Sequence, residues 1–290
     1  MFFSENVRKA ALPLINLALD EDNVKNDATG IAAFNNNETC SVNVVAREKM
    51  TLAGMPIIPL VFNKIDENIS VNLLRNDGET VGEAEILAVV SGPAVSVLAG
   101  ERTMLNFLQR LSGIATITKE YVDAAKDSNV DIIDTRKTTP GWRVLEKYAV
   151  KCGGGVNHRF NLADMIMFKD NHIALSGKSI SELILSAKSS FPNLKIACEA
   201  DTLEQVKILL NCDVDIIMLD NMSVEMIKRA VVLNNGKSIL EATGGITLNN
   251  IRDVANTGVN RISVGAITHS VKAVDIGMDV DYEQIKLENI

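Results

Sequence analysis

The sequence predicts an α/β protein made of an N-terminal α+β domain, an α/β sandwich, and a C-terminal α/β barrel. Six short apolar runs in the last two thirds of the chain each end in polar or glycine residues. Runs and helical patterns alternate there every ~20–35 residues, which is the spacing of successive βα units. Between residues 39 and 90 the hydrophobic period is two, which is typical of antiparallel strands.

The N-terminal part begins with a helix, because apolar residues recur at helical spacing over residues 5–20. Alternating apolar residues then predict strands around residues 40–46, 69–73 and 86–90, with a turn at Asn76-Asp77-Gly78. We place the first domain at residues 1–101. An amphipathic helix, with Arg102 at its start and an apolar stripe from Leu105 to Ala125, leads into the second domain, residues 102–270.

The six apolar runs of the second domain predict parallel strands. They are residues 130–134, 164–168, 194–198, 215–219, 238–242 and 261–265. Helix starts are predicted at a capping box of Ser179 and Glu182, at a similar pair of Asp201 and Glu204, and at Ser223 and Thr247. Parallel strands bring their C-terminal ends to one face, where barrel enzymes carry their sites.

The end of the chain predicts one more strand. Val274, Ile276, Met278, Val280 and Tyr282 alternate with glycine and acidic residues. Because a barrel offers no free edge, we expect residues 271–290 to return to the sheet of the first domain.

Charge and composition exclude several classes of protein. The chain has 290 residues, 47% hydrophobic and 23% charged, as in an ordinary folded enzyme. Its net charge of −8 argues against a partner that is nucleic acid or an anionic membrane. Between Asp134 and Lys169, however, basic residues outnumber acidic ones. This local excess indicates a small polyanionic ligand.

The cysteines and the absence of a leader indicate a cytoplasmic protein. Cys40, Cys152, Cys198 and Cys212 form no CxxC pair, so we expect free thiols in a reducing compartment. The first residues lack a secretory signal pattern. The longest uncharged stretch, residues 86–100, is shorter than the ~18–20 residues of a membrane span.

Polar clusters that follow the strands supply candidate site residues. Glu199 and Asp220 suit Mg²⁺ or ribose hydroxyls, or else cap helices and form salt bridges. The Thr243-Gly244-Gly245 turn, before a helix expected to start at Thr247, suits a phosphate, although many such turns bind nothing. His158 beside Arg159 is the strongest ligand candidate among the three histidines.

Taken together, the motifs resemble one family, the quinolinate phosphoribosyltransferases (nicotinate-nucleotide pyrophosphorylases, decarboxylating). The matching segments are ERTMLNFLQRLSGIAT (101–116), DTRKTTPG (134–141), KYAVKCGGG (147–155), NHR (157–159), FKDNHI (168–173), LDN (219–221), EATGG (241–245) and ISVGA (262–266). The resemblance covers essentially the whole chain. Departures from the family pattern are Thr243 for serine, Ala197 for a glutamate, Asn161 for glycine, and a looser loop at residues 26–29.

The resemblance implies a reaction, a cofactor and an assembly. Quinolinate and 5-phosphoribosyl diphosphate would give nicotinate mononucleotide, pyrophosphate and CO₂, with Mg²⁺. The irregular open barrel would have fewer than eight strands. In a homodimer, the sandwich domain of one subunit would cover the barrel mouth of the other, with Arg102 reaching the neighbouring site.

The resemblance and the residue chemistry together assign roles. Catalytic roles fall to Lys137, Lys169, Glu199 and Asp220, and Mg²⁺ to Glu199 and Asp220. The substrate-binding set is Arg102, Thr135, Arg136, Lys137, His158, Arg159, Lys169, Glu199, Asp220, Thr243, Gly244, Gly245, Val264, Gly265 and Ala266. Planar guanidinium groups bind a flat dicarboxylate bidentately, and backbone amides near the glycines would hold the 5′-phosphate.

Three alternatives stay open on the sequence. A paralogous enzyme associated with molybdenum transport would share the scaffold with another acceptor. A non-catalytic sensor of phosphorylated metabolites would share the barrel. A barrel aldolase or isomerase would use Lys169 to form a Schiff base.

Overall fold

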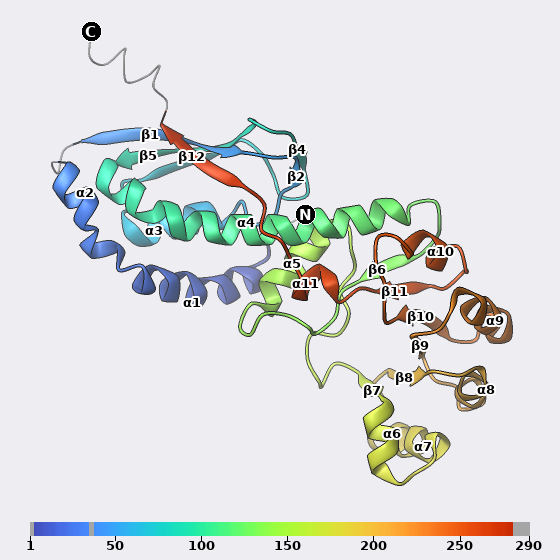
Figure 1. Ribbon diagram of the computed structural model, residues 1–290. Helices are drawn as coiled ribbons and strands as arrows, with labels where there is room; N and C mark the ends of the chain where they lie inside the picture. Colours follow the sequence, from blue (N-terminus) through green and yellow to red (C-terminus); the bar gives the residue numbers. More distant parts are fainter. Residues whose placement is uncertain (1–2, 35–37, 281–290) are drawn as a thin grey trace. The chain divides into compact units, whose positions relative to one another are not determined.

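The computed structural model describes residues 3–34 and 38–280 of the chain, which form two compact units. The first unit comprises residues 1–119, 139–154 and 270–290, and the second comprises residues 120–138 and 155–269. Figure 1 labels the elements of both.

The first unit is an α+β domain built on a four-stranded antiparallel sheet in the order β12-β1-β5-β3. Its strands are β1 (Thr39–Ala46), β3 (Ser70–Leu73), β5 (Ile86–Pro93) and β12 (Ile276–Val280), beside a separate pair β2 (Met50–Thr51) and β4 (Thr80–Val81). Its helices are α1 (Glu5–Glu21), a 3₁₀ turn at Val24–Asn26, α2 (Ala28–Ala33), α3 (Ile57–Ile65), most of α4 (Ala94–Ala124) and α5 (Arg143–Cys152). Apolar side chains from alternate strand positions, such as Val42, Val44 and Val90, are buried in its core.

The last described strand lies in the sheet of the first unit. β12 pairs antiparallel with β1, with Val44 opposite Met278. The predicted continuation of this strand through Tyr282, and the rest of residues 281–290, lie outside the described residues.

The second unit is an open α/β barrel. Its six parallel strands are β6 (Asp131–Ile133), β7 (Ile166–Phe168), β8 (Ile196–Ala200), β9 (Ile216–Asp220), β10 (Ile239–Thr243) and β11 (Arg261–Ser263). They run in the order β6-β11-β10-β9-β8-β7, and in the described part of the chain β6 and β7 do not pair to close the ring. The predicted fold class, an irregular open barrel beside an α+β domain, is confirmed.

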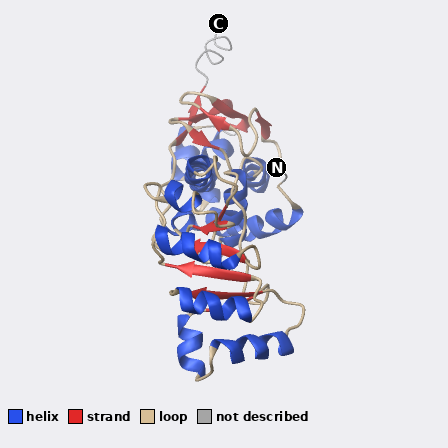
Figure 2. Ribbon diagram, turned by 90° about the vertical axis from the view of Figure 1, so that its right-hand side faces the viewer, coloured by secondary structure: helices blue, strands red, loops and turns tan. Residues whose placement is uncertain are grey.

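Helices cover the outer side of the barrel strands, as Figures 1 and 2 show. The helices that follow the strands of this unit are α6 (Asp170–Ser176), α7 (Ile180–Ser190), α8 (Leu203–Asn211), α9 (Val224–Asn234), α10 (Ile251–Ala255) and α11 (Ala266–His269). A cluster of buried apolar side chains in this unit comprises Met165, Ala197, Ile216 and Met218.

Two predicted helix starts are confirmed and two are wrong. Ser179 and Glu182 form the predicted capping box, and the Ser223 side chain caps α9. At α8, however, Thr202 caps the helix with Gln205, one residue after the predicted Asp201–Glu204 pair. Thr247 caps no helix, because α10 begins four residues later, after Asn250.

Other differences concern apolar segments of the first unit. The helix α3 falls within a region where only strands are expected. Its buried residues Ile57, Ile58, Val61 and Phe62 follow a helical spacing, with Asn63 and Lys64 exposed, so the prediction of strands alone is wrong here. The helix α4 begins at Ala94, before the expected start at Arg102. No helix in the described ranges is both long and apolar enough to span a membrane.

Candidate active site

A cavity of ≈ 700 Å³ lies at the C-terminal ends of the six barrel strands. The residues that line it are Thr135, Arg136, Lys137, His158, Arg159, Met167, Lys169, Asp170, Glu199, Met218, Asp220, Asn221, Glu241, Thr243, Gly244, Gly245 and Ser263. Most of the predicted site residues are therefore brought together in one place by the barrel topology.

The basic wall of the cavity follows β6 and the segment 157–159. Asp134, which is fully buried, accepts hydrogen bonds from the Asn157 side chain (2.6 Å) and from the His158 backbone N–H (2.8 Å). These bonds fix the backbone immediately before Arg159. The Arg159 guanidinium donates to the Met165 carbonyl at 2.8 Å, which holds it at the edge of the cavity.

Arg159 and Arg136 lie close enough to affect each other. The pKa of Arg159 is lowered, first by burial and then by the positive charge of Arg136. Two guanidinium groups that repel one another in a partly buried wall favour a ligand with more than one negative charge.

Lys137 lies on the loop that follows β6. Its backbone N–H donates to the Thr135 hydroxyl at 3.1 Å, and its carbonyl accepts from the Thr268 hydroxyl at 2.8 Å. These two bonds fix the loop backbone and leave the ammonium group of Lys137 exposed.

The opposite wall carries acids from β8 and β9. Glu199 forms an ion pair with Lys169, whose side chain is 43% exposed, and accepts a bond from the Asp170 backbone N–H. The pKa of the Asp220 carboxyl is raised by burial and then by the nearby charges of Glu199 and Asp201. Negative charge on this side is therefore only partly compensated by the protein itself.

Between these walls, β10 ends in the turn formed by Thr243, Gly244 and Gly245. Gly244 has φ +83°, and a Cβ atom there would lie 2.3 Å from the Asn221 side-chain oxygen. Gly245 has φ +63° but faces open space. The turn thus needs glycine at position 244 both for its backbone conformation and for its close approach to Asn221.

Four predicted site residues are not among those that line the cavity. Val264 is buried after β11, and Gly265 lies against the aliphatic part of Lys137 and the His269 ring, followed by Ala266. Arg102 is exposed on α4, in the first unit, where it borders a separate small hollow with Thr103, Asn106 and Trp142.

The prediction of site residues missed several members, of which Glu241 is the most informative. Glu241 is fully buried on β10, and its Oε2 lies 3.4 Å from His158 Nε2. Met167, Asp170, Met218, Asn221 and Ser263 were also missed. A charged residue inside an apolar strand run was the available signal for Glu241, because such a side chain must face the barrel interior.

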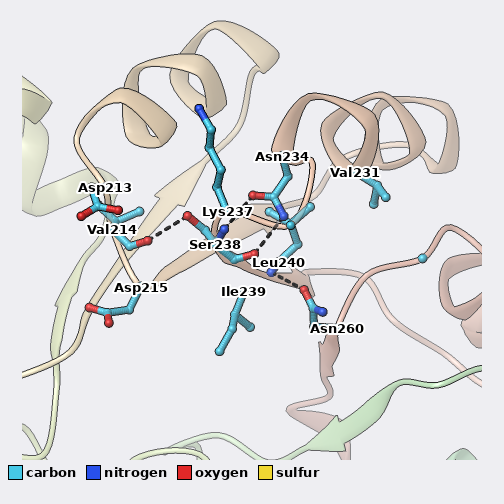
Figure 3. Close-up of a pocket in the computed structure, with 12 residues that line it drawn as sticks. Asp213, Val214, Asp215, Val231, Asn234, Lys237, Ser238, Ile239, Leu240 and Asn260 are labelled. Atoms are coloured by element: carbon cyan, nitrogen blue, oxygen red, sulfur yellow. Dashed lines mark hydrogen bonds between the residues drawn. The ribbon is translucent and has the colours of Figure 1, made fainter.

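A second hollow lies near the opposite ends of the strands, where β9 and β10 begin (Figure 3). Several of its polar groups form hydrogen bonds with one another. The Ser238 hydroxyl donates to the Val214 carbonyl, and the Asn234 side chain bonds the backbone of Ser238. The Asn260 side chain accepts from the Leu240 N–H. This arrangement indicates a structural role, and the strand-end cavity remains the candidate active site.

All four cysteines are free, as the sequence predicts. Burial raises the pKa of the Cys152 and Cys198 thiols to about 12. Thiolate chemistry at neutral pH is therefore not expected from either side chain.

Comparisons with known proteins agree with one another. The family models for the quinolinate phosphoribosyl transferase N-terminal domain and C-terminal domain match residues 27–112 and 114–279. A protein of Bacillus subtilis named "probable nicotinate-nucleotide pyrophosphorylase [carboxylating]" is 42% identical over 275 residues, covering 95% of each chain.

Solved structures of similar proteins give the same result. The nicotinate-nucleotide pyrophosphorylase of Ehrlichia chaffeensis is 41% identical with a TM-score of 0.89, covering 97% of this chain and 100% of that one. The corresponding protein of Francisella tularensis is 37% identical with a TM-score of 0.89, covering 94% and 96%.

Proposed function

The chain belongs to the quinolinate phosphoribosyltransferase family, and from that premise we propose how its strand-end cavity carries out the reaction. The protein is a pentosyltransferase of NAD biosynthesis. It transfers phosphoribosyl from 5-phosphoribosyl diphosphate to quinolinate with decarboxylation, giving nicotinate mononucleotide, pyrophosphate and CO₂. The comparisons support this activity and not that of a paralogue associated with molybdenum transport.

Quinolinate binds against the basic wall. Arg136 and Arg159 present two guanidinium groups to a flat dicarboxylate, and the pKa of Arg159 is lowered first by burial and then by the charge of Arg136. The single observation that carries the proposal is this pair of cations facing the acids Glu199 and Asp220 across one cavity.

Phosphoribosyl diphosphate binds toward the acidic wall and the glycine turn. Glu199 and Asp220 accept hydrogen bonds from the ribose hydroxyls, and they stabilise the positive charge that develops at the ribosyl carbon as pyrophosphate departs. Lys137 and Lys169 neutralise diphosphate charge. The turn Thr243–Gly245 holds the 5′-phosphate through backbone N–H groups, together with Val264, Gly265 and Ala266.

This wall also fits Mg²⁺. The pKa of Asp220 is raised by burial and by the charges of Glu199 and Asp201, so its ionised form is disfavoured. A bound cation would stabilise that ionised form. No group of three or more His, Cys, Asp or Glu side chains within the described ranges could hold a metal. The proposed site instead uses the two carboxylates of Glu199 and Asp220 with substrate phosphates, a ligand set that Mg²⁺ often takes. When bound, it would neutralise charge on the leaving pyrophosphate.

Decarboxylation needs no further protein cofactor. Ribosylation of the ring nitrogen makes a pyridinium, which accepts the electrons left by loss of CO₂. The protein contributes positioning and electrostatics.

We also propose a homodimer with composite sites, in which Arg102 contributes to the partner's cavity. Its exposure on α4 in the first unit leaves its guanidinium available for such a contact. The cytoplasmic location stays a prediction from the sequence.

The direct test is incubation of the purified protein with quinolinate, phosphoribosyl diphosphate and Mg²⁺, with detection of nicotinate mononucleotide and CO₂. Stoichiometric formation of both is expected, and a chelator should abolish it. Product from another nitrogenous acceptor but none from quinolinate would instead favour the paralogous enzyme.

A further inference from the structure

Glu241 is a buried carboxylate with almost no compensation from the protein. It is fully buried on β10 and lines the active-site cavity. Neither of its carboxylate oxygens has a hydrogen-bond partner in the part of the chain that the structure describes. Burying a carboxylate in this way is costly, so a specific role should explain its presence.

The basic group that faces Glu241 is the imidazole of His158. Nε2 of His158 lies 3.4 Å from Oε2 of Glu241, and the His158 side chain is only 7% exposed. That separation is long for a hydrogen bond, but such contacts in ligand-free sites commonly shorten when substrate binds.

The other ring nitrogen of His158 identifies its tautomer. Nδ1 accepts a hydrogen bond from the backbone N–H of Arg159 at 2.7 Å. A nitrogen that accepts a bond cannot carry a proton, so the ring proton is on Nε2 and points toward Glu241. Nδ1 of His158 therefore faces the Arg159 backbone, and Nε2 faces the Glu241 carboxylate.

This arrangement connects Glu241 to the basic wall. Glu241 faces the Nε2–H of His158, His158 accepts the backbone N–H of Arg159, and the Arg159 side chain is fastened to the Met165 carbonyl. Displacing the imidazole would remove the hydrogen bond that holds the Arg159 backbone N–H, while the bonds of Asp134 to the preceding backbone would remain.

We propose that Glu241 is a positioning residue for quinolinate: its buried carboxylate holds His158 as the Nε2–H tautomer, and His158 in turn orients Arg159. The link to quinolinate rests on the proposed function, whereas the tautomer of His158 does not.

The tautomer can be measured in the ligand-free protein. With ¹⁵N-labelled histidine, long-range ¹H–¹⁵N correlation distinguishes a pyridine-type Nδ1 from a protonated Nε2. The chain has only three histidines, so loss of signals in His158→Asn assigns the ring. If that variant does not fold, His172→Asn and His269→Asn assign it by exclusion. We expect the Nε2–H tautomer near pH 7, and an Nδ1–H tautomer or an imidazolium overturns the proposal.

Steady-state kinetics test the functional consequence. Glu241→Gln keeps the shape of the side chain and removes its charge. We expect the KM for quinolinate to rise roughly tenfold, with the KM for phosphoribosyl diphosphate changing less than about twofold. Glu182→Gln, at an exposed helix cap outside the cavity, is the matched control and should change neither value.

A double-mutant cycle separates positioning from general loss of structure. If Glu241 acts through His158, then Glu241→Gln adds no further effect on quinolinate KM in a His158→Asn background. Additive effects, or equal rises in both KM values, would overturn the proposal. If the Nε2–H tautomer is found but quinolinate is not a substrate, the proposed function fails while the structural part of this inference stands.

Discussion

Basic and acidic side chains line different parts of the cavity. Arg136 and Arg159 crowd one wall, and the acids Glu199 and Asp220 lie on the other with Lys169 paired to Glu199. The negative charge of the acidic wall is only partly compensated by Lys169, which suits a reaction with developing positive charge at a ribosyl centre.

Asp220→Asn should therefore stabilise the fold while impairing function. The pKa of Asp220 is raised in the folded state, so the protonated form favours folding and the ionised form opposes it at neutral pH. That stabilisation is present below the ordinary pKa of aspartate and is lost as the pH rises through the raised folded value. Asparagine removes the ionised form, so the Tm of the variant should exceed that of the wild type at pH 7.

Calorimetric titration supplies the functional half of this test. Affinity for phosphoribosyl diphosphate with Mg²⁺ should fall by roughly ten- to a hundredfold in Asp220→Asn, with little change for quinolinate. The Tm difference should vanish near pH 3, where both proteins carry a neutral side chain. A lower Tm at pH 7 with equal loss of both affinities would indicate a folding defect.

At the scale of elements, strand ends and turns place the site. The loop after β6 that carries Arg136 and Lys137 leads into Thr139, whose backbone N–H donates to the buried Glu146 of α5. Arg110 of α4 pairs with the same carboxylate at 2.6 Å. Because Glu146 is fully buried, this pair fixes the C-terminal end of the loop far better than a surface ion pair would.

The glycine turn after β10 gives a test with an internal control. Gly244→Ala places a methyl group against Asn221 and strains a positive φ, whereas Gly245→Ala strains φ alone in open space. Gly245→Ala should cost about 1–2 kcal/mol of stability. Gly244→Ala should cost more and should also raise the KM for phosphoribosyl diphosphate. Equal losses of stability from chemical denaturation would show that the contact with Asn221 is unimportant.

Elements were predictable where the local pattern is strong. All six barrel strands were expected from short apolar runs that end in polar residues, and each lies within or beside its expected range. The α3 helix was not, although its buried residues Ile57, Ile58, Val61 and Phe62 recur at helical spacing, because this short helix lies between segments of strand-like alternation. The Thr247 cap failed for another reason: the Asn250 side chain accepts the Thr247 N–H in a turn that precedes α10.

Across the whole molecule, most of the predicted site residues line one cavity, because parallel strands converge on one face. Glu241 was not predicted, because it precedes the end of β10 and its role depends on His158, far away in sequence. Long-range pairs of this kind leave no local pattern. The proposed role of Arg102 likewise depends on the proposed dimer and leaves no local pattern in one chain.

Subunit mixing tests that assembly. Arg102→Ala and Lys169→Ala should each be inactive alone. If Arg102 acts in the partner's cavity, a mixed dimer has one site with both residues intact and one site lacking both, so activity should return toward half of the wild-type value per dimer. Demonstrated subunit exchange without any recovery would exclude a contribution of Arg102 across the interface.

The most direct test of the central claim, that the cavity is built for a dicarboxylate, is the comparison of quinolinate with nicotinate as acceptors in one assay with Mg²⁺. Nicotinate lacks one carboxylate and leaves a guanidinium of the basic wall unpaired, which costs several kcal/mol. The account predicts a kcat/KM for nicotinate lower by at least roughly a thousandfold, with CO₂ released only from quinolinate. Comparable turnover of nicotinate would contradict it.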